Sequence, residues 1–306
     1  MFYLGLDIGG TKMAAVVINA EGKEFGRYRT QTVKESYAAF IDRLTQFISD
    51  IKQALDAPLA IGMALPGSVS PINGKIKNSN ILVLNGQDLQ SDLQARLGSA
   101  VIIANDANCF ALSEACDGAG QGHEVVFGLT LGTGCGGGIA LQQRAFTGAW
   151  GNAAECGHIT LPGYNLLRDG PAVKCYCGKT NCTESFVSGT GLAERYYLLC
   201  GEMRSAPEIL HLAKEGQAHA CEQVARFRHQ LTRLLATVVN IIDPHIIVIG
   251  GGLSNEPILL DGIEREIAPL VFTDQFLTPV VKAVHGDSSG MRGAAWLAVR
   301  AHVQTD

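Results

Sequence analysis

The chain reads LGLDIGGTKMAAVV from Leu4 to Val17, and a second stretch of the same kind, FGLTLGTGCGGGIA, runs from Phe127 to Ala140. In each stretch an apolar segment runs into a turn rich in glycine and threonine and continues as a second apolar segment, a pattern that predicts a β-hairpin. One strand–turn–strand unit used twice predicts an internal duplication, and hence two similar lobes with a cleft between them.

The segments around the two hairpins alternate between strand and helix patterns. Residues 37–55 place apolar side chains mostly three and four positions apart, which predicts an amphipathic helix. Strands alternating with helices, with glycine-rich turns at the strand ends, predict an α/β fold. The predicted strands are 3–6, 13–18, 60–64, 100–103, 125–131, 139–141 and 245–249, and the predicted helices are 109–115, 189–200, 206–214, 218–241 and a last one from Gly290.

Composition excludes several classes of protein. With 306 residues and 47% apolar content, the chain can bury a sizeable core in two domains, so disorder is not expected. A net charge of -5 offers no basic surface for nucleic acid or for an anionic membrane. The first residues lack the pattern of a secretory signal, and the nine cysteines are odd in number, which favours a reducing compartment. We expect a cytoplasmic protein that binds neither nucleic acid nor membrane.

One histidine and three cysteines lie close together between positions 158 and 182. Thiolate sulfur and imidazole nitrogen are the ligands that zinc prefers, and a closed set of four is typical of a structural ion. The alternative is that the cysteines are only small buried side chains. The tight CxCGxxxC spacing, with a turn residue inside it, favours zinc. The predicted ligands are His158, Cys175, Cys177 and Cys182.

Two carboxylates, Glu155 and Glu184, flank this cluster. Carboxylates accept hydrogen bonds from vicinal hydroxyls, and a zinc-bound imidazole has its other N–H fixed in direction, ready to donate to a sugar oxygen. The alternative for either glutamate is an ordinary solvated charge. We predict that Glu155, His158 and Glu184 bind carbohydrate.

The glycine-rich turns are candidates for phosphate binding, because without a Cβ the backbone N–H groups can approach phosphate oxygens closely. The run from Gly132 to Gly137 formally matches a dinucleotide fingerprint, but a strand follows it instead of a helix, which excludes NAD. A single such turn is more often only a tight hairpin. Two copies, together with the turn 250–252, favour the phosphates of a nucleotide. Asp7 at the first turn could orient Mg²⁺ through its water shell, or could simply form the turn.

Asp106 is the candidate general base. It follows a predicted strand and begins a helix, the position at which open α/β sheets bind ligands. Phosphoryl transfer needs a carboxylate that aligns the attacking hydroxyl and accepts its proton. An Asn-Asp pair at a strand end is also a common helix cap, so both interpretations stay open.

Taken in order, these motifs resemble the ROK family of bacterial sugar kinases and repressors, within the actin and hexokinase fold group. The resemblance covers essentially the whole chain and rests on DIGGT, Pro66-Gly67, NDAN at 105–108, GTGCGGG, ExGH, CxCGxxxCxE, the GGG turn and the segment 286–295. It implies an actin/hexokinase-like (ribonuclease H-like) two-lobed fold with a structural zinc site. The small lobe would cover 1–116, completed by a C-terminal helix at 290–306, and the large lobe would cover 117–289.

The resemblance also implies an ATP-dependent sugar kinase that uses Mg²⁺ with ATP and carries structural Zn²⁺. Asp106 would be the catalytic base, the four residues of the His/Cys cluster would hold zinc, and the chain would form a homodimer. ATP would be bound by Asp7, Gly9, Gly10, Thr11, Lys12, Gly132, Thr133, Gly134, Gly136, Gly251 and Gly252; sugar would be bound by Asn80, Asn105, Asp106, Glu155, His158 and Glu184.

Within the family, the segments 67–80, 84–86 and 174–179 look most like fructokinases of the mannofructokinase type, with N-acetylglucosamine kinases or a broad hexokinase as the alternatives. We therefore expect γ-phosphate transfer to the primary 6-hydroxyl of a hexose, fructose first. Two departures stand out: Ala154 and Asn181 each replace a usual glycine. Family repressors carry a helix-turn-helix ahead of DIGGT, which the six residues before Asp7 do not supply. A non-catalytic sugar sensor is the alternative from another class, and the intact Asp106 argues against it.

Overall fold

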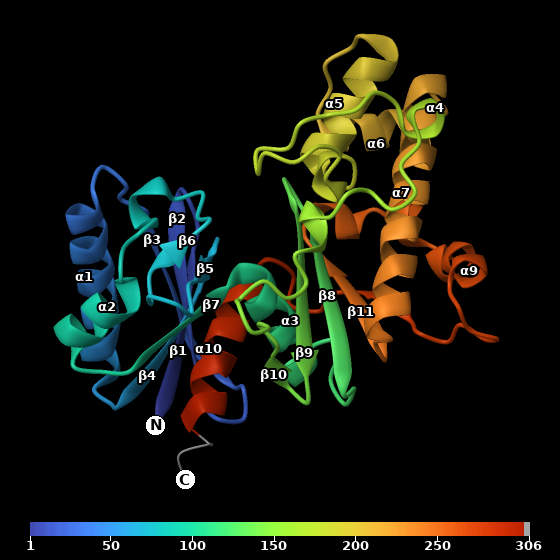
Figure 1. The fold of residues 1–306 in the computed structure, drawn as a ribbon. Coiled ribbons are helices and arrows are strands. Elements are labelled where there is room, and N and C mark those ends of the chain that lie inside the picture. The colour runs from blue at the N-terminus through green and yellow to red at the C-terminus, as the bar shows by residue number, and fades with distance from the viewer. Residues whose placement is uncertain (303–306) are drawn as a thin grey trace. The chain divides into compact units, whose positions relative to one another are not determined.

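The computed structural model describes residues 1–302, apart from the side chain of Asp287, and these residues form two compact units (Figure 1). Unit 1 contains residues 1–122, 138–153 and the chain from His285 onward, and unit 2 contains 123–137 and 154–284. Unit 1 thus includes residues 138–153, which the sequence prediction assigned to the second lobe. The last four residues of the predicted helix 290–306 lie outside the described residues.

The sheet of unit 1 begins with the first predicted hairpin. Its strand order is β3-β2-β1-β4-β7, with β1 antiparallel to β2 and parallel to β4, and with β4 parallel to β7. The edge strand β3 was not predicted, because its side chains alternate between partly buried and exposed and form no apolar run. The strands are β1 (Phe2–Ile8), β2 (Lys12–Ile18), β3 (Glu24–Gln31), β4 (Leu59–Leu65) and β7 (Val101–Asn105), with a separate small pair β5 (Ser68–Val69) and β6 (Ile76–Lys77).

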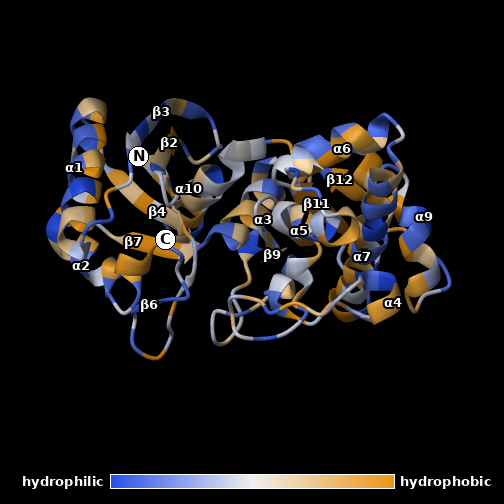
Figure 2. Cartoon of the chain, turned by 90° about the horizontal axis from the view of Figure 1, so that it is seen from above, coloured by the Kyte–Doolittle hydropathy of each residue, from blue (hydrophilic) through white to orange (hydrophobic). Residues whose placement is uncertain are grey.

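Helices cover both faces of this sheet. Leu4 and Leu6 belong to an apolar cluster with α1 (Tyr37–Leu55) and α2 (Leu89–Leu97), whereas Tyr3 and Val16 pack with α3 (Asp106–Asp117) and α10 (Ser289–His302). Successive side chains of a strand point to opposite faces, so a strand covered on both sides is apolar throughout. Figure 2 shows the hydrophobic strands between helices whose outer faces are hydrophilic.

Helix α10 lies directly on the backbone of two neighbouring strands. Gly5 of β1 and Gly62 of β4 are paired in register. A Cβ on Gly5 would come within 1.9 Å of the Met291 carbonyl oxygen, and one on Gly62 would come within 1.8 Å of the Ala294 carbonyl oxygen. Only glycine permits this approach, so the two glycines set the position of α10 on the sheet.

The second sheet repeats the pattern of the first. Its order, β10-β9-β8-β11-β12, again places a hairpin beside two parallel strands. The equal strand order supports the duplication that the two glycine-rich stretches predicted. Residues 135–138, predicted as part of the second turn, instead belong to a strand. The strands are β8 (Val125–Leu131), β9 (Cys135–Leu141), β10 (Arg144–Ala145), β11 (Ile246–Gly250) and β12 (Val280–Lys282).

Most of the remaining helices of the chain belong to unit 2. The longest, α7, buries Phe227, Leu231 and Leu234 on one face, as its apolar spacing predicts. The helices are α4 (Leu166–Asp169), α5 (Gly189–Cys200), α6 (Ala206–Lys214), α7 (Ala218–Ile242), α8 (Pro257–Leu260) and α9 (Ile263–Ile267), and the 3₁₀ turns of both units are η1 (Leu82–Leu84), η2 (Cys156–His158), η3 (Thr183–Ser185), η4 (Gly252–Asn255), η5 (Ala268–Leu270) and η6 (Gly286–Ser288).

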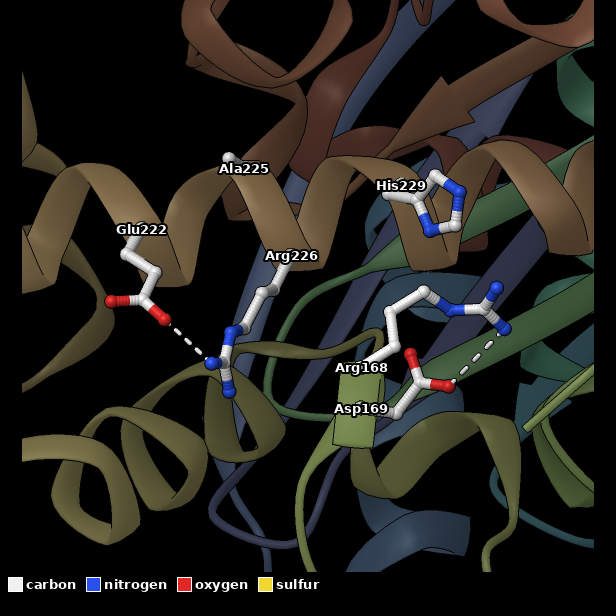
Figure 3. A pocket seen from close by; sticks show the side chains of 6 residues that line it. All are labelled: Arg168, Asp169, Glu222, Ala225, Arg226 and His229. Carbon is white, nitrogen blue, oxygen red and sulfur yellow. Dashed lines mark hydrogen bonds and ion pairs between the residues drawn. The ribbon is translucent and has the colours of Figure 1, made fainter. Parts of the chain in front are cut away.

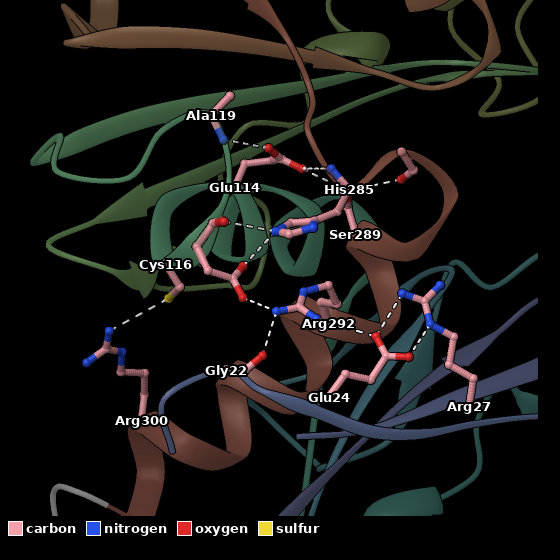
Figure 4. Close-up of polar contacts among 12 residues, drawn as sticks. Gly22, Glu24, Arg27, Glu114, Cys116, Ala119, His285, Ser289, Arg292 and Arg300 are labelled. Carbon is pink, nitrogen blue, oxygen red and sulfur yellow. Dashed lines mark hydrogen bonds and ion pairs between the residues drawn. The ribbon is translucent and has the colours of Figure 1, made fainter. Parts of the chain in front are cut away.

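A polar network joins α3 to the start of α10 inside unit 1 (Figure 4). The fully buried Glu114 carboxylate accepts hydrogen bonds from the Ser289 hydroxyl at 2.9 Å and from the His285 backbone N–H at 3.3 Å. One turn later, Asp117 pairs with the His285 ring and with Arg292. Buried carboxylates are stable only when donors surround them, so these contacts fix where α10 begins. Within residues 1–302, no helix is long and apolar enough to cross a membrane.

Candidate active site

The first glycine turn directs its carbonyl groups to one side. The Thr32 hydroxyl donates to the Gly9 carbonyl at 2.7 Å, the Lys34 ammonium donates to the Gly10 carbonyl at 2.9 Å, and the Thr32 N–H donates to the Thr11 carbonyl at 3.1 Å. In a trans peptide the N–H points opposite to the C=O of the same peptide unit. The N–H groups of Gly10 and Thr11 therefore face away from Thr32 and Lys34, side by side, as an anion site requires.

The second glycine turn is arranged in the same way. The N–H of Gly189, at the start of α5, donates to the Gly132 carbonyl at 2.7 Å, and the N–H of Thr190 donates to the Thr133 carbonyl at 3.4 Å. By the same geometry, the N–H groups of Thr133 and Gly134 face away from α5. Both copies of the duplicated unit thus present two neighbouring N–H groups.

Other glycines of the predicted phosphate set have structural roles. The N–H of Gly9 donates to the Lys12 carbonyl at 2.9 Å, and the N–H of Gly132 donates to the Gly134 carbonyl at 3.0 Å, so these two groups close their own hairpins. Gly136 lies within β9, where its carbonyl accepts from the Thr130 hydroxyl at 3.2 Å.

The third glycine turn packs against the second. Gly251 has a φ of +81°, and a Cβ there would lie 2.4 Å from the Leu131 carbonyl oxygen. Glycine at this position therefore lets the turn after β11 rest on the end of β8. Gly252 begins η4 directly afterwards.

Asp7 lies at the end of β1, against the first turn of α10. A Cβ on Gly290 would come within 2.9 Å of the Asp7 Oδ2 atom. A helix N-terminus favours a neighbouring negative charge, so this position suits an ionised carboxylate. Lys12 is exposed at the start of β2.

The sequence left open whether the pair Asn105-Asp106 is a helix cap or supplies a general base, and the structure gives the two residues different contacts. Asn105 is the N-cap of α3: its Oδ1 accepts from the Ala107 N–H at 2.9 Å, while its Nδ2 donates to the Gly67 carbonyl at 3.1 Å. Asp106 is exposed as the first residue of α3, and its Oδ1 also accepts from the Ala107 N–H, at 2.8 Å. Asn105 is therefore the residue that caps the helix, so a need for a cap does not account for the aspartate at position 106.

The loop that carries Asn80 folds onto the same place in unit 1. The Asn85 side chain bonds Ser79 twice, accepting from its N–H and donating to its carbonyl, both at 2.9 Å. Gly67 has a φ of +90°, and a Cβ there would lie only 2.8 Å from the Ser79 nitrogen. Gly67 thus lies against Ser79, which precedes Asn80, and against Asn105, which precedes Asp106.

In unit 2, the three other predicted sugar-binding residues lie on two adjacent turns, η2 and η3. Glu155 directly precedes η2, His158 is its last residue, and Glu184 lies in η3. The Thr183 N–H donates to the Ile159 carbonyl at 2.8 Å and so links the two turns. Glu184 also reaches the first residue of β9, directly after the second glycine turn, where its Oε2 accepts from the Cys135 N–H at 2.9 Å. The sequence did not predict this contact, which joins a sugar-binding candidate to the residue that follows Gly134, a phosphate-binding candidate.

The four predicted metal ligands come together in unit 2. Their donor atoms all lie within 4.8 Å of one another, with 3.5 Å between the sulfurs of Cys177 and Cys182 and 3.7 Å between Cys175 Sγ and His158 Nδ1. Bond lengths of about 2.3 Å to sulfur and about 2.0 Å to nitrogen place ligands of a tetrahedral zinc ion about 3.5–3.8 Å apart. The donor set and these two spacings therefore fit one tetrahedral ion.

Tyr176, between two of the cysteines, contacts the other nitrogen of the His158 ring. Its hydroxyl lies 3.0 Å from His158 Nε2, and the two rings meet edge to face with centroids 5.2 Å apart. Desolvation by the neighbouring atoms, together with the charges of Glu184, Cys175 and Glu155, raises the pKa of Tyr176 to about 12, so the phenol is protonated at neutral pH. The sequence analysis did not single out Tyr176, although it lies inside the CxC motif.

The two departures from the usual glycines both occupy left-handed backbone positions. Ala154 has a φ of +63° and Asn181 a φ of +59°. The Asn181 side chain also accepts a hydrogen bond from the Val173 N–H at 2.9 Å. Asparagine tolerates this conformation, whereas alanine adopts it only with strain.

A separate pocket of about 280 Å³ lies between α4 and α7 (Figure 3), lined by Arg168, Asp169, Glu222, Ala225, Arg226 and His229. None of the predicted site residues lines it. The buried Asp169 pairs with Arg233 at 2.5 Å, and Glu222 pairs with Arg226 at 2.5 Å. The charges at this pocket are thus paired within the protein, which is consistent with a structural role for them.

Residues 3–301 match the sequence model of the ROK family. This chain belongs to the ROK family. The resemblance that its motifs indicated, to the sugar kinases of this family, is confirmed. An N-acetyl-D-glucosamine kinase of Photobacterium profundum is 37% identical over 301 residues, which cover 97% of this chain and 99% of the relative.

Two solved structures of the ROK family extend the comparison. The ROK hexokinase from Thermus thermophilus superimposes with a TM-score of 0.86 at 28% identity, covering all of both chains. A ROK family glucokinase from Streptomyces griseus, solved in complex with glucose and AMPPNP, has a TM-score of 0.77 at 28% identity and covers 98% of this chain and 100% of its own. The predicted hexokinase-like α/β fold is therefore confirmed. The preference for fructokinases is not matched, because the relative from Photobacterium profundum is an N-acetyl-D-glucosamine kinase, which the sequence analysis gave as an alternative.

Proposed function

We propose that this ROK protein is an ATP-dependent kinase that transfers the γ-phosphate to the primary 6-hydroxyl of N-acetyl-D-glucosamine. The observation that carries the proposal is the pair of glycine turns, each of which presents two neighbouring N–H groups away from its own anchoring contacts. Such pairs bind phosphate oxygens. The choice of sugar rests on the name of the curated relative, and the choice of nucleotide is supported by the AMPPNP complex of the glucokinase.

Phosphoryl transfer depends mainly on position and charge, and the proposal assigns both to residues of this chain. The N–H groups of the two turns would hold the nucleotide phosphates. Asp106 would accept the proton of the sugar hydroxyl as the hydroxyl oxygen attacks the γ-phosphorus, while the bond from this phosphorus to the β–γ bridging oxygen breaks and ADP leaves. Mg²⁺ would accompany ATP, and Asp7 would hold part of its water shell.

The proposal assigns the sugar contacts to the six residues that the sequence predicted. Asn80, Asn105 and Asp106 come from unit 1, and Glu155, His158 and Glu184 come from unit 2. Asn105 and Glu184 already accept backbone N–H groups, but an amide oxygen or a carboxylate accepts more than one hydrogen bond. Their backbone contacts would therefore hold them in place for the sugar.

We further propose that the His/Cys cluster holds structural zinc. A zinc ion would replace weak sulfur contacts by four strong bonds and would fix the ring of His158 against η3. The homodimer implied by the resemblance and the cytoplasmic location expected from the cysteine content and the first residues stay predictions.

Coupled assays of ADP release with N-acetylglucosamine, N-acetylmannosamine, glucose, mannose and fructose test the proposal. We expect the highest kcat/KM with N-acetylglucosamine. A clear preference for fructose would restore the sequence-based choice of substrate, and no turnover with any of these sugars would exclude a hexose kinase.

Asp106→Asn tests the role of the base. We expect kcat to fall by about 10²–10⁴-fold, because the amide cannot accept the hydroxyl proton, while sugar binding by calorimetry remains. Asp50→Asn, an exposed position on α1 of the same unit, is the matched control and should keep normal turnover. Equal activity of the two variants would show that Asp106 is not the base.

A further inference from the structure

The ring of His158 is held at both nitrogens. Nδ1 faces Cys175 Sγ at 3.7 Å, inside the proposed metal cluster, and Nε2 faces the Tyr176 hydroxyl at 3.0 Å. A metal ligand uses the lone pair of an imidazole nitrogen, so the single ring proton then resides on the other nitrogen. In the metal-bound protein the Nε2–H of His158 therefore donates to the phenol oxygen of Tyr176.

This hydrogen bond occupies the Nε2–H of His158, the group that would donate to the sugar. A neutral imidazole has one N–H and can donate one good hydrogen bond. Under the proposed function, a sugar oxygen accepts that same hydrogen bond. The phenol and the sugar oxygen cannot both accept it with full strength.

From this geometry we infer that Tyr176 caps His158 in the sugar-free protein and that a sugar hydroxyl must displace the phenol before His158 can bind it. The inference rests on the proposed function, because it assumes that His158 contacts the sugar. It makes Tyr176 a positioning residue of the sugar site, although the residue is neither a proposed metal ligand nor one of the predicted sugar contacts.

The surroundings of Tyr176 allow this exchange. Tyr176 is 82% exposed, so its ring can turn into solvent without opening a cavity. The backbone beneath it is fixed by hydrogen bonds from the Cys175 N–H to the Lys179 carbonyl at 2.9 Å and from the Gly178 N–H to the Cys175 carbonyl at 3.0 Å. A rotation about χ1 therefore releases the imidazole N–H while the cysteine ligands stay in position.

Tyr176→Phe tests the inference because it keeps the ring and removes the hydroxyl. We expect the zinc-loaded variant to bind N-acetylglucosamine roughly 2–10-fold more tightly by calorimetry without nucleotide, the effect of removing one competing neutral hydrogen bond. Tyr197→Phe, a half-exposed tyrosine on α5 of the same unit, is the matched control and should leave the affinity unchanged. Unchanged or weaker binding by Tyr176→Phe would overturn the inference.

A second measurement does not depend on catalysis. Nitrogen-15 NMR of the zinc-loaded, sugar-free protein should show the Nε2–H of His158 shifted upfield and exchanging faster in Tyr176→Phe, with no change in Tyr197→Phe. Elemental analysis should show equal zinc in all three proteins. If no sugar is phosphorylated but the NMR signal changes, the proposed function fails and the contact between Tyr176 and His158 stands. If turnover is normal and neither the signal nor the affinity changes, the inference fails alone.

Discussion

Asn181 and Ala154, which stand where the family usually has glycine, both occupy left-handed backbone positions, and each meets the cost of that conformation differently. Asn181, with a φ of +59°, offsets the strain by accepting the Val173 N–H. Ala154, with a φ of +63°, has no polar side chain that could do so. A non-glycine residue in this region costs about 1 kcal/mol. Ala154 precedes Glu155 directly, so this strain lies beside a proposed sugar contact.

We predict that Ala154→Gly stabilises the protein by about 0.5–1 kcal/mol, because glycine adopts a positive φ without a Cβ clash. Thermal denaturation should show a midpoint raised by about 1–3 °C for a chain of this size. Asn181→Gly is the informative comparison: it removes the side-chain bond to Val173 and should lower the midpoint. A lowered midpoint for Ala154→Gly would mean that the alanine methyl makes a favourable contact that outweighs the strain.

At the scale of elements, the contact between α3 and the start of α10 depends on charge. The hydrogen bond with Asp117 raises the pKa of His285, against the opposing effect of burial. Burial by itself would raise the pKa of Asp117, but its hydrogen bonds with His285 and Arg292 outweigh this effect and lower the pKa. A raised histidine pKa stabilises the fold below about pH 6.5, and this contribution is lost as pH rises through the folded-state value. The contribution of Asp117 is present above about pH 3.8 and is lost as pH falls through its lowered pKa.

We therefore predict that His285→Gln destabilises unit 1 most between about pH 4 and pH 6.5, by about 1.5 kcal/mol, and much less at pH 9. Urea denaturation at pH 5.5 and pH 9 measures the difference. His219→Gln, an exposed position on α7, controls for loss of a histidine charge alone. A loss of stability for His285→Gln that is equal at both pH values would indicate a packing role without a charged pair.

At the scale of the whole molecule, the metal cluster connects stability with sugar binding. His158 belongs to both the proposed zinc set and the proposed sugar set, so metal loss should weaken both. We predict that chelation of zinc lowers the thermal midpoint and reduces affinity for N-acetylglucosamine at least about 10-fold, the scale on which changes around metal ligands act. Calorimetry before and after chelation, with zinc added back, measures both effects.

Cys177→Ser should reproduce the effect of chelation, because it removes one ligand of the four. Cys221→Ser changes an exposed thiol of the same unit outside the cluster and should behave like the unchanged protein. If a zinc-free protein kept its full thermal stability and its full affinity for the sugar, zinc binding would not be coupled to sugar binding.

Much of the whole-molecule organisation could be predicted because its signals are local. The helices α1, α5 and α6 begin and end at the predicted residues, since apolar spacing and glycine or serine caps mark their ends. The duplicated hairpins were predicted from residues adjacent in the chain. Strand β3 was missed because an edge strand with one solvated face needs no apolar run, and residues 135–138 were missed because glycines in a strand look like a turn.

The sequence by itself determined the family, the two glycine turns and the four candidate metal ligands, because each depends on residue types at fixed short spacings. Only the tertiary structure decided which atoms meet. Glu184 bonds the Cys135 N–H across 49 positions of the chain, Asn105 caps α3 while bonding Gly67, and the Tyr176 hydroxyl faces the ring nitrogen that the sugar was expected to use. These contacts follow from the packing of the start of β9, η2 and η3 in one unit and of β7 and the 66–85 loop in the other, which no local pattern specifies.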